Sequence, residues 1–277
     1  MIKNIAYFPS QAAMNSVPVM RAVLNSLAVQ GVEAVPNSMD SDAAVIWSVL
    51  WAGKMLPNQT VYSHYRSQNK PVVIVEVGAL YRGHTWKVSV NHVTADGHYG
   101  HQNNLDWDRP KKLGLALQHT KSTKPEIVIA LQHAKSLQVA GLDIHRWIRD
   151  QVLALRQHTD RPIKIRPHPR SPTVLPADMI VQQPKHLAGS YDSFDLNLQC
   201  HAVVNFNSGP GIQAAIAGCR PLVDQSSLAS PVSIAVEDIE SPYDIDRSQW
   251  LVEICHTEYT VDELENGLWL KRIKEVL

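Results

Sequence analysis

Short apolar runs alternate with amphipathic segments through the first third of the chain. The apolar runs have the length of strands and are rich in β-branched residues, whereas the segments between them carry apolar residues at helical spacing. The predicted strands are 2–8, 32–35, 43–50 and 71–75, and the predicted helices are 10–29 and 58–68. Strands that are apolar throughout and are separated by helices are typical of a parallel sheet covered on both faces. Residues 1–76 are therefore predicted to begin a Rossmann-like domain.

A second series of strands and helices follows the lysine-rich segment 111–124, which is predicted to be a linker. Its predicted strands are 126–131, 162–165, 178–182, 202–206 and 221–223, and its predicted helices are 143–158, 193–199 and 212–217. Two further helices are expected at 247–256 and 261–276. Thr260 and Glu263 have the spacing of a capping box at the start of the last one. We predict two domains, 1–118 and 119–277, the second of which includes the terminal helices.

The composition narrows the class of protein. The 277-residue chain has 26 basic and 26 acidic side chains, whereas a generic nucleic-acid binder is usually basic. The cysteines, Cys200, Cys219 and Cys255, lack metal-like spacing and are odd in number, which favours a reduced, cytoplasmic protein. No apolar run approaches the roughly 18 residues that span a bilayer, and the N-terminus lacks the apolar core of a signal peptide. We expect a globular α/β protein without a transmembrane segment.

Residues 202–224 have the pattern of a strand, a tight turn, a helix and a second strand. The turn, Asn207-Ser208-Gly209-Pro210-Gly211, has two glycines that let the backbone approach a ligand closely. The next helix directs free N–H groups and a positive dipole end at the turn, which is how α/β proteins hold phosphate. Asn207 and Ser208 are candidates to cap this helix or to donate to the ligand. Such turns are weak signals, so an ordinary βαβ connection is the alternative.

Two other predicted strands of the second series end in polar residues. Gln132 follows strand 126–131, and strand 162–165 continues into Arg166-Pro167-His168-Pro169-Arg170, where the prolines stiffen the backbone. The arginine fork matches phosphate oxygens, and histidine donates to phosphate or carries a proton near neutral pH. Because ligands gather at the carboxyl ends of parallel strands, these groups and the glycine turn predict a phosphate clamp. A surface turn with solvated charges is the alternative.

In the first series, Glu76 stands at the carboxyl end of strand 71–75. It is a candidate catalytic carboxylate or contact to a sugar hydroxyl, and a surface or capping carboxylate is the alternative. Residues 82–109 are rich in His, Trp and Asn, which indicates a long functional loop with a short hairpin at 86–90. The candidates for contact with a polar substrate are Arg82, His84, Trp86 and Asp96. Because there is no HExxH motif and no tight Cys/His pairing, we predict no metal site.

Taken together, these motifs resemble the donor-binding half of GT-B-type glycosyltransferases. The similarity is to the capsule polysaccharide synthesis family, which includes Kdo transferases, and to its short phage-borne relatives. The matching segments are Arg166-Pro167-His168-Pro169, Asp195-Leu196, Asn207-Ser208-Gly209 and, in the first half, Glu76-x-Gly78. Gln213 stands where the family commonly has an acidic residue, which weakens the case for ribose recognition by a carboxylate.

The resemblance implies a GT-B-like fold, with two Rossmann-like domains facing across a cleft and C-terminal helices that cross back. It implies a nucleotide-sugar-dependent glycosyltransferase that needs no metal and has no cofactor besides the nucleotide sugar as co-substrate. The implied catalytic residues are Glu76, His168 and Asp195. The residues expected to hold the donor phosphate and nucleotide are Gln132, Arg166, His168, Asn207, Ser208, Gly209 and Gly211.

Two acceptor classes stay open. One is a saccharide or surface glycan, and the other is a hydroxymethylated pyrimidine in phage-type DNA. Basic clusters at 82–87, 109–124 and 161–170 favour DNA, with Trp86 or Trp107 filling the gap of a flipped base, whereas the neutral net charge argues against it. The sequence also leaves open a non-catalytic nucleotide-sugar or polysaccharide-binding module and a GT-B-type epimerase. It does not choose between inversion with Glu76 as general base and retention with a carboxylate nucleophile.

Overall fold

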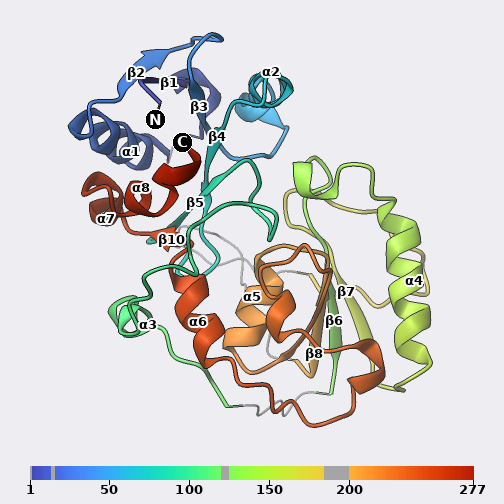
Figure 1. The fold of residues 1–277 in the computed structure, drawn as a ribbon. Helices are drawn as coiled ribbons and strands as arrows, with labels where there is room; N and C mark the ends of the chain where they lie inside the picture. The colour runs from blue at the N-terminus through green and yellow to red at the C-terminus, as the bar shows by residue number, and fades with distance from the viewer. Residues whose placement is uncertain (1, 14–15, 120–124, 184–199) are drawn as a thin grey trace. The chain divides into compact units, whose positions relative to one another are not determined.

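The structure of the chain, a computed structural model, describes residues 2–13, 16–119, 125–183 and 200–277 (Figure 1). The chain forms two compact units, of which the first contains Met1–Arg109 and Glu253–Leu277 and the second Pro110–Val252. This division differs from the predicted domains, 1–118 and 119–277, because apolar residues of the C-terminal segment pack into the core of the first unit.

The first unit is built on a six-stranded sheet with the strand order β10-β5-β4-β3-β1-β2. Its strands are β1 (Asn4–Tyr7), β2 (Glu33–Pro36), β3 (Ala43–Trp47), β4 (Val72–Val77), β5 (Trp86–Val90) and β10 (Glu258–Tyr259). The first four are parallel, whereas β5 and β10 run antiparallel to their neighbours. The four predicted parallel strands are confirmed to within a few residues. The hairpin expected at 86–90 is instead one strand that pairs with β4 and β10.

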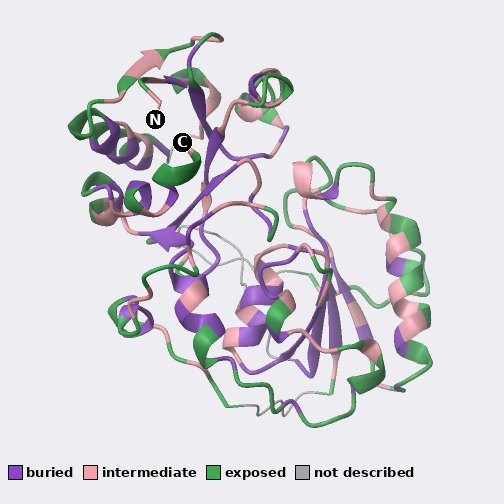
Figure 2. Ribbon diagram, viewed as in Figure 1, coloured by how far each residue is buried: buried purple, intermediate pink, exposed green. Residues whose placement is uncertain are grey.

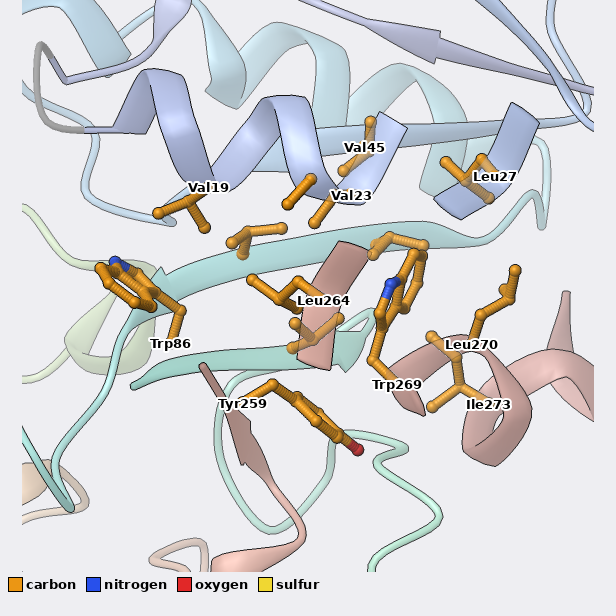
Figure 3. Close-up of a cluster of buried hydrophobic side chains, with 14 of the residues drawn as sticks. Val19, Val23, Leu27, Val45, Trp86, Tyr259, Leu264, Trp269, Leu270 and Ile273 are labelled. Carbon is orange, nitrogen blue, oxygen red and sulfur yellow. The ribbon is translucent and has the colours of Figure 1, made fainter. Parts of the chain in front are cut away.

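Helices complete the first unit. One face of the sheet is covered by α1 (Val17–Val29), α7 (Val261–Glu265) and α8 (Leu268–Ile273), whose apolar side chains share one core with the strands (Figure 3). On β3 and β4 lies α2 (Asn58–Ser67). The predicted capping box of Thr260 and Glu263 is confirmed. The helix predicted at 261–276 is interrupted at Gly267. This residue has a φ of +67°, a left-handed conformation that glycine adopts readily, and it separates α7 from α8.

The second unit contains a parallel sheet with the order β7-β6-β8-β9. Its strands are β6 (Ile127–Ala130), β7 (Ile163–Arg166), β8 (Ala202–Asn205) and β9 (Arg220–Val223). Along each strand, successive side chains point to opposite faces of the sheet. One set packs on α4 (Ile144–Arg156) and the other on α5 (Gly209–Ile216), so the two helices cover opposite faces. The strands between them are buried (Figure 2). The chain returns to the first unit through α6 (Ser248–Cys255). Each unit is thus a Rossmann-like α/β layer structure, as predicted.

Three predicted elements are not found as predicted or cannot be compared with the structure. Helix 10–29 begins only at Val17, after a 3₁₀ turn at Pro9–Gln11. Segment 178–182 makes one isolated bridge, between Val181 and Ile165, rather than a strand, and its Ile180 and Val181 are exposed. Helix 193–199 lies outside the described residues.

The remaining short elements are α3 (Arg109–Lys112) and 3₁₀ turns at Gly53–Met55, Leu137–Val139, Ser230–Val232, Val236–Asp238 and Lys274–Val276. Within the described part of the chain, no helix has both the length and the apolar character to cross a bilayer.

Candidate active site

The carboxyl edge of the second sheet has a topological switch point between β6 and β8. From β6 the chain moves outward to β7 on one side and then returns to β8 on the other. In open α/β sheets, ligands bind outside the carboxyl ends of the strands at such a point. The sequence motifs 132–133 and 207–211 lie just after β6 and β8, and motif 166–170 begins at the last residue of β7. The structure therefore brings these three predicted motifs to one edge.

Gln132 and Asn207 bind each other across the switch point. The Gln132 Oε1 atom accepts from the Asn207 backbone N–H at 2.8 Å, and Gln132 Nε2 donates to Asn207 Oδ1 at 2.9 Å. The Asn207 amide also donates to Ser226 Oγ at 2.9 Å. Both side chains are buried. These hydrogen bonds fix the glycine turn against β6, and the contacts of Gln132 and Asn207 with a ligand stay predictions.

Asn205, which the sequence analysis did not single out, supports the same turn from within β8. Its Nδ2 atom donates to Ala130 O at 2.8 Å and to Ser208 Oγ at 3.0 Å, and its Oδ1 atom accepts from Ser208 N at 2.8 Å. A polar residue within the apolar run 202–206 is the signal that could have identified it. The side chain is buried and satisfied, so it stabilises the turn from beneath.

Helix α5 begins at this turn, with Ser208 as an N-cap residue in extended conformation and Gly209 as the first helical residue. The Ser208 side chain makes no capping hydrogen bond to the helix, so the first N–H groups of α5 are not capped from this residue. A Cβ atom at Gly211 would lie 2.7 Å from Val223 Cγ1, so this glycine lets α5 pack closely on β9.

Two histidines from neighbouring loops meet beside β6 and β7. The rings of His133 and His168 are 5.2 Å apart and nearly perpendicular, at 69°. Nδ1 of His133 accepts from Lys135 N and Nδ1 of His168 from Arg170 N, both at 3.2 Å, so in the neutral rings Nε2 carries the proton. Burial, reinforced by the positive charges of Lys135 and Arg170, lowers the pKa of His133. His133 was not among the predicted site residues, although it directly follows Gln132.

Arg166, the other predicted member of the clamp, ends β7 and is buried. Asp195, predicted to be catalytic, lies outside the described residues. Among those that are described, no group of three or more His, Cys, Asp or Glu side chains is arranged to hold a metal ion.

In the first unit, Glu76 lies in β4 one residue before the strand ends and is half-buried. Its Oε2 atom accepts a hydrogen bond of 2.6 Å from Ser48 Oγ. Ser48 directly follows β3 and has a φ of +63°, which is uncommon for a residue other than glycine. A backbone held in this sparsely populated region is a feature often found at functional sites. Ser48 and Glu76 therefore form a carboxylate centre at the carboxyl edge of the first sheet.

The four predicted acceptor contacts lie in different surroundings. Arg82 is half-buried in the turn after β4, His84 is exposed and stacks on Tyr81 with ring centres 4.1 Å apart, and Asp96 is exposed. Trp86 is only 7% exposed and lies in the core under α1 (Figure 3). Its ring is already covered by apolar side chains, so the predicted contact of Trp86 with an acceptor or with a gap in DNA is replaced by a packing role.

Comparison with known proteins gives structural matches but no sequence match. No family model and no curated protein matches the chain. The chain is structurally similar to two Kdo transferases. These are the β-Kdo 2,4- and 2,7-transferases of KpsC from Thermosulfurimonas dismutans, each 12% identical, with TM-scores of 0.48 and 0.49 over 97% of this chain and 98% and 99% of theirs. The spinosyn rhamnosyltransferase SpnG is also similar, with 11% identity and a TM-score of 0.32 over 99% of this chain and 100% of that chain.

Proposed function

We propose that the chain is a glycosyltransferase that moves a sugar from a nucleotide-sugar donor to a hydroxyl group. The second unit would bind the donor and the first would bind the acceptor. The observation that carries this proposal is the edge at β7, β6 and β8. There, the His133–His168 pair, the end of β7 at Arg166 and the start of α5 follow three adjacent strands. These groups suit a phosphate ester.

The chemistry requires the leaving phosphate to be stabilised while the glycosidic bond breaks. The N–H groups at the start of α5, the Nε2–H groups of the two histidines and the Arg166 guanidinium can supply this stabilisation without a metal ion. Glu76 would take the proton from the attacking hydroxyl if the reaction inverts the anomeric centre. Asp195 remains a predicted catalytic residue on the motif alone.

We propose a saccharide rather than DNA as the acceptor. Three basic residues of the clusters expected to face a DNA backbone are paired with carboxylates: Arg109 with Glu263 at 2.6 Å, Arg161 with Glu240 at 2.8 Å and Lys164 with Glu126 at 2.9 Å. Paired charges release fewer counterions from a polyanion, so they contribute less to DNA affinity. A hydroxymethylated pyrimidine is the second candidate acceptor. A non-catalytic binding module or an epimerase would differ from a glycosyltransferase because neither would form an acceptor with an added sugar.

Replacing His168 or Ser208 with Ala is expected to weaken nucleotide binding about 10- to 100-fold, since a hydrogen bond to a charged group contributes roughly 1.5–3 kcal/mol. His168 would lose its donor to phosphate, and Ser208 would lose the hydroxyl that meets Asn205 in the structure and is proposed to donate to the same phosphate. Calorimetric titration with UDP, TDP and CMP measures the effect. His145→Ala, an exposed histidine of the same unit, is the matched control and should bind as the wild type does. Unchanged affinity in both test variants would reject the donor site.

Nucleotide binding near pH 7 is also expected to take up protons. The lowered pKa of His133 leaves its ring neutral there, and a phosphate anion alongside favours the protonated ring. At lower pH the free ring is already protonated, so the uptake should vanish. Titrations in buffers of different ionisation enthalpy measure the number of protons, and His133→Gln should abolish the uptake. Binding without any proton uptake at either pH would place the phosphate away from His133.

A further inference from the structure

Three charged residues stand side by side across the carboxyl edge of the first sheet. Glu76 of β4 is the cross-strand partner of Lys87 in β5, and Lys87 is also the partner of Glu258 in β10. Cross-strand partners share one face of a sheet, with Cβ atoms about 5 Å apart. Glu76, Lys87 and Glu258 therefore form a row of alternating charge, here called the Glu-Lys-Glu row.

The row is largely removed from water. Glu258 is 0% exposed, Lys87 is 8% exposed and Glu76 is half-buried. Lysine and glutamate are almost never buried unless they are paired, because a desolvated charge without a partner is strongly unfavourable. Lys87 stands between the two glutamates in the register of the strands, and the negative charges of Glu258 and Glu76 favour its charged form. Neither Lys87 nor Glu258 was among the predicted site residues.

Glu258 binds the turn that follows β4. Its carboxylate accepts from Ala79 N at 2.6 Å, from Leu80 N at 3.1 Å and from Thr85 Oγ1 at 2.7 Å. Gly78 leaves the space for this carboxylate, because a Cβ atom there would overlap Glu258 Oε2. One end of the row is thus fixed to the backbone of Ala79 and Leu80, in the turn that follows β4.

We propose that Lys87 is a positioning residue for the reaction, whose ammonium group stabilises the negative charge of Glu76 from the neighbouring strand while Glu258 fixes the turn beyond it. The proposal rests on the proposed function for the role of Glu76 as base, whereas the electrostatic coupling within the row does not depend on it. The first unit would in this way hold its base ready to accept a proton with a charge supplied from the neighbouring strand.

The charges around Lys87 support this role. Burial lowers the pKa of Lys87, and the negative charges of Glu258 and Glu76 oppose that shift. The coupling between two opposite charges is reciprocal, so each stabilises the charge of the other. Ser48 faces Glu76 from the loop after β3. From the loop after β5, Tyr99 stays neutral because burial raises its pKa, and Glu258 and Asp96 act in the same direction on it.

A titration of Lys87 tests the coupling without any assay of activity. The ¹³Cε resonance of Lys87 is followed against pH in the wild type, in Glu76→Gln and in Glu33→Gln, an exposed control on β2. Lys87 should titrate at lower pH in Glu76→Gln than in the wild type, because one of its two counter-charges is gone, and should be unchanged in the control. Glu258→Gln should act in the same direction. Identical titration in the wild type and in Glu76→Gln would overturn the proposal.

The pH dependence of kcat/KM then tests the role in the reaction. In Lys87→Met, the acid limb should move to higher pH, because removal of a neighbouring positive charge disfavours the ionised form of a carboxyl group. Lys87→Arg should restore the limb, and the exposed Lys54→Met should leave it in place. An unmoved limb in a folded Lys87→Met protein would contradict the positioning role. A wild-type chain without transferase activity, but with the coupled titration, would instead reject the proposed function alone.

Discussion

Replacing Glu76 with Gln is expected to lower turnover at saturating donor and acceptor by about 100-fold or more, which is the usual contribution of a general base. Glutamine keeps the size of the side chain and can still accept from Ser48 Oγ, but it cannot take the acceptor proton. Donor affinity should stay near the wild-type value, because the donor site is proposed to lie on the other unit. Steady-state kinetics and nucleotide titration of the same preparation measure the two effects.

The comparison separates two roles of Glu76. A loss of donor binding with normal turnover at saturation would make it a donor contact. Wild-type turnover would leave Asp195, Asp96 or His84 as better candidates for the base. Removal of the base should also flatten the acid limb of the pH profile. Glu33→Gln, an exposed glutamate of the same unit, should leave turnover and pH profile unchanged.

Replacing Arg109 with Met is expected to lower the free energy of unfolding of the first unit by about 3–5 kcal/mol, since removing one partner of a buried ion pair leaves an uncompensated group. Arg109 is 3% exposed. Its guanidinium donates to Glu263 Oε1 at 2.6 Å, to Glu258 O at 2.6 Å and to Cys255 O at 2.5 Å. These bonds tie the C-terminal segment to the rest of the unit. Urea unfolding measures the loss, and amide exchange should increase in α7 and α8.

The same variant should change the acid stability of the unit. Burial raises the pKa of Glu263, but the hydrogen bonds and charge of Arg109, together with Thr260, outweigh burial and lower it overall. A lowered carboxyl pKa contributes stability that is present above the unfolded pKa of about 4.3 and is lost as the pH falls through the folded value. In Arg109→Met, the free energy of unfolding should therefore depend less on pH in that acid range than in the wild type. Arg21→Met, on the exposed side of α1, is the control, and an equal effect there would contradict the anchoring role of Arg109.

Local pattern is enough to predict most of the parallel strands. Runs such as 71–75 are apolar on both faces, and only a sheet covered on both sides buries them. The meeting of the three donor-side motifs is also predictable. The carboxyl ends of parallel strands lie at one edge of a sheet, and the structure has β6, β7 and β8 adjacent there. What local pattern cannot show is the partner of each side chain. Gln132 and Asn207 look like free donors in the sequence, and only the fold brings them within 2.9 Å of each other.

The carboxylate centre depends on contacts between residues far apart in the chain. Glu258 reaches the turn at Ala79 from 179 residues away. The sequence pattern assigns its segment to the second domain, so no periodicity within 71–90 could reveal the buried charge beside Lys87. Trp86 shows the reverse case, since a tryptophan next to histidines suggests a binding surface until the core beneath α1 is known. Local periodicity also does not reveal that the chain leaves the first unit after Arg109 and returns to it at Glu253.

The most direct test of the central claim is a transfer assay with the full chain. A panel of nucleotide sugars is incubated with saccharide acceptors and, separately, with hydroxymethylated DNA, and both the released nucleotide and the mass of the acceptor are measured. The account predicts that one nucleotide sugar releases its nucleotide in step with a sugar added to an acceptor, preferentially a saccharide, and that His168→Ala and Glu76→Gln both lose this product. Nucleotide binding without release or transfer, for every donor and acceptor in the panel, would contradict it.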